Sequence, residues 1–387
     1  MPHEQPWNNS KAPRANNLDF LRLFFASLVI WSHSYPLLRG EANASEPVSR
    51  LTRGQTTGGG LAVAFFFIIS GFLITQSWFS SRGVGNFARK RVLRLYPGFI
   101  VVSAFCAYVA APLGGAPWGE LLHAFSLPRF LMNQALLYLP AVGGAFARHP
   151  MPYVLNGSAW TIKYEFWCYG IVAVFGLLGL LKRRALVLAA FALSLAVYAL
   201  QTNHVISGPL PFENGRTWYL FGDFSLYGRF VPLFLAGSVF FLFREVIPFS
   251  PRLAAFCAAG LAAGTVLGQL NPLLPVLGTY LVFFAGFAPF AGERLRDFGR
   301  RGDLSYGVYL YAFPVQQLLI HYLPGRLTPP TLFLAALPPT FALAALSWRF
   351  VESPFLRRKT SQFRPGASPP AMPASSGGGP AITLPER

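Results

Sequence analysis

Three ionisable side chains interrupt a long apolar run near the N-terminus, NNLDFLRLFFASLVIWSHSYPLL. Asp19, Arg22 and His33 each cost free energy in a hydrophobic setting, so their presence calls for a reason. With a rotation of about 100° per residue, the three side chains fall within a sector of about 60° on one helix. They can therefore face one interior cavity, with Arg22 and His33 roughly 16–17 Å apart along the axis. The alternative is a local Asp19–Arg22 pair and a packing histidine.

A second set of ionisable residues opens a later apolar segment, NGSAWTIKYEFWCYG. Glu165 and Tyr169 are four positions apart and share a helix face. If the topology below holds, Glu165 and Lys163 lie at the depth of His33, where a carboxyl group and a neutral imidazole can form an acid–base pair. The alternative is a structural Lys163–Glu165 pair held at the interface by aromatic side chains.

The third set is the basic segment FARKRVLRLYP, with four cations in six positions ahead of Pro97. Such a cluster can bind phosphate groups at the inner mouth of a helix bundle. It also serves as an orientation signal for membrane insertion, which needs no ligand.

Composition identifies the elements that must position these side chains. Of the 387 residues, 53% are hydrophobic and 12% are charged, whereas soluble domains average about 25% charged residues. We therefore predict an all-α integral membrane protein. The net charge of +18 falls in short clusters between apolar runs, which indicates membrane orientation and not nucleic-acid binding. The three cysteines lie in apolar segments without metal-ligand spacing and are expected to pack.

The apolar pattern predicts about ten transmembrane helices, since a span needs about 20 apolar residues. They cover residues 18–37, 59–79, 94–112, 160–181, 185–201, 229–243, 253–270, 273–291, 304–323 and 331–350. The apolar stretch 119–144 contains two prolines and is expected to be interfacial or re-entrant. Most of the Lys and Arg fall on one side, so both termini are predicted to be cytoplasmic.

The chain is accordingly divided into an N-terminal cytoplasmic arm (1–17), a membrane domain (18–357) and a disordered cytoplasmic tail (358–387). We expect no cleavable signal peptide, because the first apolar run follows a polar arm and lacks a small-residue cleavage site.

Six segments in order resemble the motifs of the membrane acyltransferase-3 family, which includes bacterial enzymes that acylate surface sugars. They are LDFLRLFFASLVIWSH, FFFIISGFLIT, FARKRVLRLYP, WTIKYEFWCYG, LSYGVYLYAFPVQ and SWRFVESPFL. The chain departs from the family at Ala312, where many relatives carry a histidine, and at Trp160-Thr161, where the family has Trp-Ser. We expect no C-terminal SGNH-type hydrolase domain, which some relatives carry.

The resemblance implies acyl transfer from acetyl-CoA or a related acyl-CoA to a hydroxyl group of a cell-surface or exported glycan. It implies a multi-pass protein of the bacterial plasma (inner) membrane. Its partners are then the lipid bilayer, acyl-CoA as co-substrate and a carbohydrate acceptor, with no permanently bound cofactor, no metal and no nucleic acid. The acceptor and the oligomeric state are left open.

The resemblance also suggests roles for the ionisable residues. Arg89, Arg91 and Arg94 would hold the nucleotide end of CoA, and Arg22 its diphosphate or pantetheine part. His33 would be the general base, or would itself be acylated.

Further residues are given supporting roles. Glu165 would orient His33 or bind the sugar. Asp19 would orient Arg22, and either Lys163 or Tyr164 would stabilise the oxyanion. The other supporting positions are Ser70, Tyr169 and Tyr306. For the Ser70-Gly71 pair and for Tyr306, a packing role is the alternative.

Two other functions are alternatives to acyl transfer. Ionisable groups in a helix bundle also suit a transporter or flippase of a glycan or a lipid-linked substrate, although no inverted repeat or pair of broken helices is visible. A non-catalytic membrane scaffold would leave Asp19, Arg22 and His33 unexplained.

Overall fold

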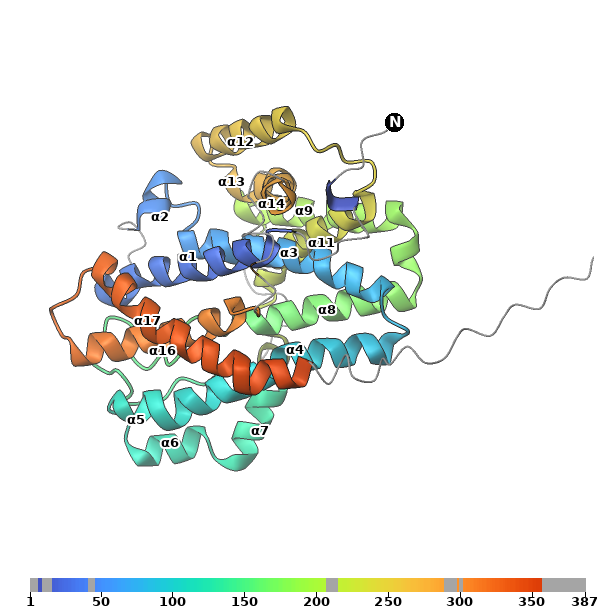
Figure 1. The fold of residues 1–387 in the computed structure, drawn as a ribbon. Coiled ribbons are helices and arrows are strands. Elements are labelled where there is room, and N and C mark those ends of the chain that lie inside the picture. The colour runs from blue at the N-terminus through green and yellow to red at the C-terminus, as the bar shows by residue number, and fades with distance from the viewer. Residues whose placement is uncertain are drawn as a thin grey trace, which may run out of the picture.

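The computed structural model describes residues 6–8, 16–40, 46–206, 215–288, 298 and 302–356. Regular structure within these ranges is helical, and no strand occurs in them. Figure 1 shows long helices running roughly side by side through the middle of the molecule, with short helices at the periphery. The predicted all-α class is confirmed for this part of the chain.

Every predicted span corresponds to a helical segment. The segments are α1 (Leu18–Arg39), α3 (Gly58–Phe79), α4 (Val84–Phe105), α8 (Thr161–Leu177), α9 (Arg184–Thr202), α11 (Ser225–Phe243), α12 (Pro251–Val266), α13 to α14 (Leu270–Leu273, η5 Leu274–Gly278 and Thr279–Phe287), α16 (Ser305–Tyr322) and α17 (Pro329–Ser347). The connecting elements are η1 (Pro6–Asn8), α2 (Pro47–Leu51), η3 (Cys106–Ala110), α5 (Ala111–Leu113), α6 (Trp118–Ala124), α7 (Leu127–Ala135), η4 (Leu180–Lys182), α10 (Gly215–Phe221) and η8 (Trp348–Glu352).

Six helical segments among the described residues are long and apolar enough to cross a membrane. They are Gly58–Phe79, Val84–Leu113, Arg184–Thr202, Thr217–Phe243, Leu270–Phe287 and Pro329–Leu356. The helices α1, α8 and α16 are not among these six segments. Each contains buried polar side chains, such as Ser34 in α1, Lys163 in α8 and Gln316 in α16. The total of ten spans and the cytoplasmic location of both termini remain predictions.

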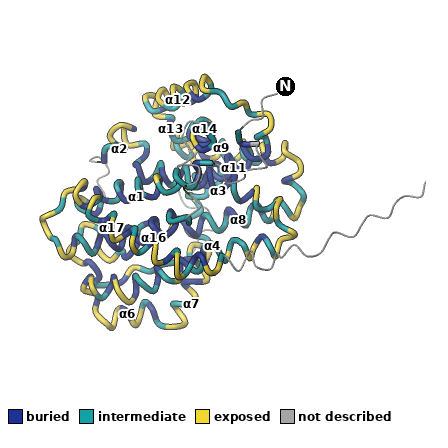
Figure 2. The backbone as a smooth tube through the Cα atoms, in the orientation of Figure 1, coloured by how far each residue is buried: buried dark blue, intermediate teal, exposed yellow. Residues whose placement is uncertain are grey.

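Within the described part of the chain, the centre of the bundle is built around α3 and α16 and the five helices that pack against them. Helix α3 packs against α1, α8 and α11, while α16 packs against α1, α4 and α17. Figure 2 shows α16 largely in the colour of buried residues, whereas α6 and α12 at the edges carry long exposed stretches. The helices that carry the predicted functional residues therefore converge on the interior.

Two glycines allow α3 and α11 to cross closely. A Cβ atom on Gly71 would overlap the carbonyl oxygen of Phe234, and one on Gly237 would overlap that of Ile68. Small residues at such crossings let helix backbones approach each other in a membrane bundle. The close-packing role considered for Ser70-Gly71 thus falls to Gly71, whereas Ser70 faces the interior.

The basic segment is part of a helix that begins ten residues before residue 94, the predicted start of the third span. Helix α4 begins at Val84, runs through the arginines and past Pro97, and continues through η3 to Leu113. Arg, Lys and Leu are strong helix formers, which favours this early start. The cations therefore sit on successive turns of one rigid element.

The segment predicted to be interfacial forms two short helices, α6 and α7, beside the main bundle (Figure 1). Trp118, Leu122 and Leu127 are each about 70% exposed. Such an apolar surface on short helices at the bundle edge agrees with an interfacial position.

The described part of the N-terminal arm docks on the bundle. Trp7 is 5% exposed, donates a 2.7 Å hydrogen bond to the carbonyl oxygen of Arg244, and packs edge-on against Phe240. The predicted tail, 358–387, lies outside the described residues.

Candidate functional site

Three cavities lie along the interior of the bundle. The arginine cavity, about 110 Å³, has as its polar lining Arg22, Ser70, Arg91, Arg94, Thr161, Glu165, Tyr169, Ser305, Tyr306 and Tyr309. The histidine cavity, about 360 Å³, has as its polar lining Ser32, His33, Glu46, Thr57, Ser158, Trp160, Thr161, Arg229 and Tyr309. The Lys90 mouth, about 480 Å³, is lined by Leu73, Gln76, Ser77, Ser80, Lys90, Arg91, Arg94 and Leu356.

Shared walls join the three cavities in series. The Lys90 mouth and the arginine cavity share Leu73, Arg91 and Arg94. The arginine and histidine cavities share Val63, Thr161 and Tyr309. The three cavities are therefore neighbours in a row, and the smallest, the arginine cavity, lies between the other two.

Helix α1 contributes residues to both inner cavities. Arg22 lines the arginine cavity and His33 lines the histidine cavity, as expected from their spacing on one face of a helix. Asp19 lines neither cavity, and its side chain is 44% exposed. Its carboxylate lies 4.0 Å from the Arg22 guanidinium, at the outer limit of an ion pair. Asp19 is thus a peripheral partner of Arg22.

Asp303 is the close partner of both buried arginines. Its Oδ2 atom forms ion pairs with Arg22 and with Arg94, and its Oδ1 atom accepts a hydrogen bond from the Ser305 hydroxyl. Burial alone would raise the pKa of Asp303, but the two guanidinium groups hold that pKa well below its ordinary value. Asp303 was missed because the pairing spans 281 positions of sequence, although an acid just before an apolar helix was a visible signal.

Glu352 is the second acidic residue that the sequence did not reveal as part of the site. It lies in the π-helical turn η8, is 2% exposed, and sits 3.6 Å from Arg94. The Ser347 hydroxyl donates a 3.2 Å hydrogen bond to it. Because π-helical turns re-aim side chains within a helix, η8 brings the last acidic residue of the membrane domain onto the arginine cluster.

The structure does not join Glu165 to His33. Glu165 accepts 2.7 Å hydrogen bonds from the hydroxyl groups of Ser70 and Tyr169. Ser70 is midway along α3, whereas the histidine cavity includes Gly60 at the start of that helix. Ten residues of helix rise by about 15 Å, so Glu165 lies deeper than the topology argument suggested. It belongs to the arginine cavity.

The basic helix α4 divides its cations between the cavities and the surface. Arg91 lines both the mouth and the arginine cavity, stacks on Tyr169 at 5.8 Å, and has a buried Nε atom without a hydrogen-bond partner among the described residues. Arg89 is exposed and lines none of the three cavities. Lys90 lines the mouth in its place and donates a 2.9 Å hydrogen bond to Ser81.

His33 has neutral neighbours. Its Nδ1 atom is 3.4 Å from the Ser158 hydroxyl, and its ring meets Phe313 edge-on at 5.3 Å. Glu46 also lines this cavity, but its two oxygens accept hydrogen bonds from the backbone N–H groups of Ser49 and Gly58. Those bonds cap α2 and hold the first residue of α3, so Glu46 has a structural task.

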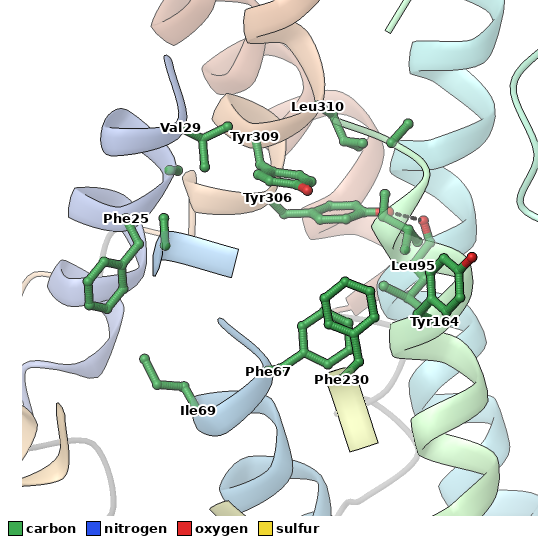
Figure 3. Packing of buried hydrophobic residues seen from close by; sticks show 14 of the residues in the cluster. Phe25, Val29, Phe67, Ile69, Leu95, Tyr164, Phe230, Tyr306, Tyr309 and Leu310 are labelled. Carbon is green, nitrogen blue, oxygen red and sulfur yellow. Dashed lines mark hydrogen bonds between the residues drawn. The ribbon is translucent and has the colours of Figure 1, made fainter. Parts of the chain in front are cut away.

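Two tyrosines one turn apart on α16 line the arginine cavity (Figure 3). The Tyr306 hydroxyl donates a 2.7 Å hydrogen bond to the carbonyl oxygen of Leu95, drawn as a dashed line. The Tyr309 hydroxyl donates to the carbonyl oxygen of Ser158 at 2.8 Å and lies 2.6 Å from the Thr161 hydroxyl. The wall between the cavities is thus fixed by hydrogen bonds.

Lys163 and Tyr164 point away from the cavities. The Lys163 ammonium donates to the carbonyl oxygen of Tyr219 at 2.9 Å and lies over the Tyr138 ring. The Tyr164 hydroxyl accepts a 2.8 Å hydrogen bond from the backbone N–H of Asp223. Neither residue lines the arginine or the histidine cavity. The suggested oxyanion role therefore finds no geometric support.

No group of three or more metal-ligating side chains occurs in the described ranges. The three cysteines are buried and unpaired, as their apolar surroundings suggested.

The fold and the cavities define a class: a polytopic helical membrane protein with adjoining polar cavities in the interior of its bundle. The chain belongs to the acyltransferase-3 family, whose model, described as an acyltransferase domain, matches residues 15–349.

Two relatives match over nearly their full length. Nodulation protein 10 of Rhizobium leguminosarum bv. viciae is 29% identical, over 92% of this chain and 97% of the relative. The O-acetyl transferase of Shigella phage Sf6 is 28% identical, over 90% of this chain and 98% of the relative. Acyltransferase MdmB of Streptomyces mycarofaciens is 28% identical over 40% of this chain and 38% of its own. No solved structure matches the chain.

Proposed function

We propose that the protein is a membrane O-acyltransferase that moves an acyl group from an acyl-CoA to a hydroxyl group of an exported or cell-surface glycan. Membership of the acyltransferase-3 family supports the reaction class. The full-length similarity to a protein named O-acetyl transferase supports oxygen as the acceptor atom and acetyl as the acyl group.

The line of three cavities is the observation that carries the proposal. The 480 Å³ mouth has room for a nucleotide, whereas the arginine cavity, at about 110 Å³, admits only a narrow chain. CoA has this shape: a bulky nucleotide diphosphate joined to a thin pantetheine arm with the thioester at its tip. An arm that extends from the mouth through the arginine cavity would bring the thioester to the histidine cavity.

The charges of the mouth favour a polyanion. Lys90 and Arg91 line it, and neither forms an ion pair with an acidic side chain among the described residues, so both cations are available to phosphate oxygens. Arg22 and Arg94 are already paired with Asp303. In our proposal Lys90 and Arg91 bind the phosphates, while the paired arginines shape the entrance to the pantetheine path.

His33 would perform the proton transfer. As the acceptor oxygen attacks the thioester carbonyl, the neutral imidazole takes the hydroxyl proton. The tetrahedral intermediate then collapses, an ester forms, and the CoA thiolate leaves and takes up the proton. Because the other ring nitrogen lies near the Ser158 hydroxyl, Ser158 would orient the ring. If His33 itself attacks the carbonyl, an acyl-imidazole precedes the ester.

The cellular setting completes the proposal. Acyl-CoA is cytoplasmic, so the Lys90 mouth would open to the cytoplasm and the histidine cavity would lie toward the opposite face. This orientation agrees with the clustering of Lys and Arg and with ten spans in a bacterial inner membrane.

The test follows acetyl-CoA with purified protein in lipid nanodiscs. Binding and the slow release of free CoA thiol are measured for the wild type, Arg91→Gln and Arg89→Gln. Loss of a charge-assisted phosphate contact should weaken acetyl-CoA binding about tenfold in Arg91→Gln, whereas Arg89→Gln should bind as the wild type does. If the wild type neither binds nor consumes acetyl-CoA or a longer acyl-CoA, the proposal is wrong, and transport of a glycan becomes the favoured function.

A further inference from the structure

A fourth cavity opens at the His33 end of the bundle. It measures about 770 Å³ and is the largest of the four described here. Its walls come from the end of α1, the segment 144–150, the end of α16 and the turn into α17. We call it the Arg148 cavity. Its volume falls within the range of about 300–1,000 Å³ that is typical of ligand pockets.

The charged lining of the Arg148 cavity is basic. Arg39, Arg148, His149 and His321 line it, and no acidic side chain does so among the described residues. Within the same part of the chain, neither Arg39 nor Arg148 forms an ion pair or a side-chain hydrogen bond. Two guanidinium groups that line one cavity and have no carboxylate partner among the described residues are suited to an oxyanion ligand.

The imidazole of His149 adds a hydrogen-bond acceptor. Gln317 is fully buried, and its amide nitrogen donates to the carbonyl oxygens of Met151 and Val154. The amide oxygen must therefore face His149 Nδ1, 2.7 Å away, and accept its proton. Burial lowers the pKa of His149, which favours the neutral ring. The remaining ring nitrogen, Nε2, is then an acceptor for a hydroxyl group.

The Arg148 cavity adjoins the histidine cavity. On α1, Pro36 lines the histidine cavity and the next residue, Leu37, lines the Arg148 cavity. The same division falls between Met151 and Pro150. The two cavities are therefore neighbours, and in our proposal one part of the ligand occupies the Arg148 cavity while another part reaches His33.

We propose that the Arg148 cavity binds an oxyanion group of the acceptor, with Arg39 and Arg148 as the anion contacts and His149 as the acceptor for a neighbouring hydroxyl group. This inference rests on the proposed function, because it names the acceptor as an anionic glycan. A sugar acid carries both a carboxylate and hydroxyl groups on one ring and fits both kinds of contact. A phosphate ester on the glycan or on its lipid carrier supplies the same oxyanion chemistry.

The test measures binding of a fluorescent trigalacturonate to the protein in phosphatidylcholine nanodiscs, with maltotriose carrying the same dye as the neutral probe. Loss of one charge-assisted contact should weaken trigalacturonate binding about tenfold in Arg148→Gln and in Arg39→Gln. Arg326→Gln is the matched control, because Arg326 is exposed in the α16–α17 turn and does not line the cavity. Thermal unfolding of each variant checks that the fold is intact.

Two further arms identify the source of the oxyanion. Inorganic phosphate is titrated against trigalacturonate, and the binding is repeated in nanodiscs that contain phosphatidylglycerol. Competition by phosphate or by the anionic lipid that disappears in Arg148→Gln supports the site and assigns its natural group as a phosphate. Trigalacturonate binding that neither one displaces supports the carboxylate of a sugar acid.

Several results would overturn the inference. They are a wild type that binds neither trigalacturonate nor phosphate, equal binding of maltotriose, and equal weakening in Arg326→Gln. Release of CoA from acetyl-CoA is measured in parallel without any glycan. Release that persists when no oxyanion binds means that this inference fails and the acyltransferase function stands. If the protein binds the oxyanion but neither binds nor consumes an acyl-CoA, the site exists and the acyltransferase function fails.

Discussion

The arginine and histidine cavities share a wall but differ in the partners of their ionisable side chains. In the arginine cavity, Arg22 and Arg94 are both paired with Asp303, and Arg94 also lies near Glu352. In the histidine cavity, the His33 imidazole contacts a serine hydroxyl and a phenyl ring. A buried charge is tolerated where its partners are fixed, whereas an imidazole without a carboxylate partner stays neutral and can accept a proton.

The difference suggests that adjacent cavities serve separate steps, donor binding on one side and proton transfer on the other. In the proposed mechanism, the side that carries Arg91 and the Lys90 mouth would stabilise charge that is present before and after the reaction, namely the phosphates of the donor. The histidine side would stabilise charge that develops only during the reaction. Substitutions on the two sides should therefore separate binding from turnover, and the predictions below test that separation from the largest effect to the smallest.

The largest effect is expected from His33→Ala. Acyl transfer should fall by about 10²- to 10⁴-fold, because a general base contributes a factor of that size. Acetyl-CoA binding should stay at the wild-type level, because the proposal places the phosphates of CoA in the Lys90 mouth, away from His33. Steady-state release of CoA thiol and equilibrium binding in nanodiscs provide the two readouts.

His33→Gln serves as the control for packing, since it keeps a polar side chain of similar size. Recovery of turnover in His33→Gln would show that the histidine fills space and carries no proton. Detection of an acetylated His33 peptide after rapid quenching would identify the acyl-imidazole route.

Asp303→Asn should destabilise the protein by about 3 kcal/mol, the lower end of the range for a broken buried ion pair, because among the described acids it leaves Arg94 with only Glu352 at 3.6 Å and Arg22 with only Asp19 at 4.0 Å. Asp19→Asn is the matched control. Its carboxylate is 44% exposed and 4.0 Å from Arg22, so its loss should cost at most about 1 kcal/mol. Denaturant unfolding in detergent compares the two variants. Equal losses would mean that both acids are equivalent partners of Arg22.

The pH dependence of stability sharpens the same comparison. The pKa of Asp303 is lower in the folded protein than in the unfolded chain, so its stabilising contribution is fully present above the ordinary aspartate pKa of about 4. That contribution is lost as the pH falls below this value toward the folded pKa. The wild type should therefore lose more thermal stability between pH 5 and pH 3, as approximate limits, than Asp303→Asn does. Parallel melting curves would contradict the assignment.

The smallest effect is expected for Glu165. Its coupling energies with Ser70 and with His33 test whether it acts in the arginine cavity or in the histidine cavity. A double-mutant cycle of Glu165→Gln with Ser70→Ala should show a coupling energy of about 0.5–3 kcal/mol in stability, because the side chains are hydrogen-bonded. A cycle of Glu165→Gln with His33→Gln should be additive within about 0.5 kcal/mol, as for groups without shared partners. Coupling to His33 instead of Ser70 would restore the acid–base pair that the sequence suggested.

The sequence predicted those features of the fold and the site that depend on local geometry. The placement of Arg22 and His33 on one face of α1 follows from helical rotation alone. The apolar segments follow from the composition of windows about 20 residues long. The basic cluster was visible in the sequence. The orientation of α4 in the bundle then determines that Lys90 and Arg91 line cavities while Arg89 is exposed.

Tertiary structure decided which distant residues meet and at what depth. Asp303 reaches Arg22 across 281 positions of sequence, and Glu165 pairs with Ser70 because α8 packs against α3. Lys163 is drawn away to Tyr219 on α10. Helical periodicity fixes the direction of a side chain around its own axis, but the choice of neighbouring helix and the axial offset come from packing across the whole bundle.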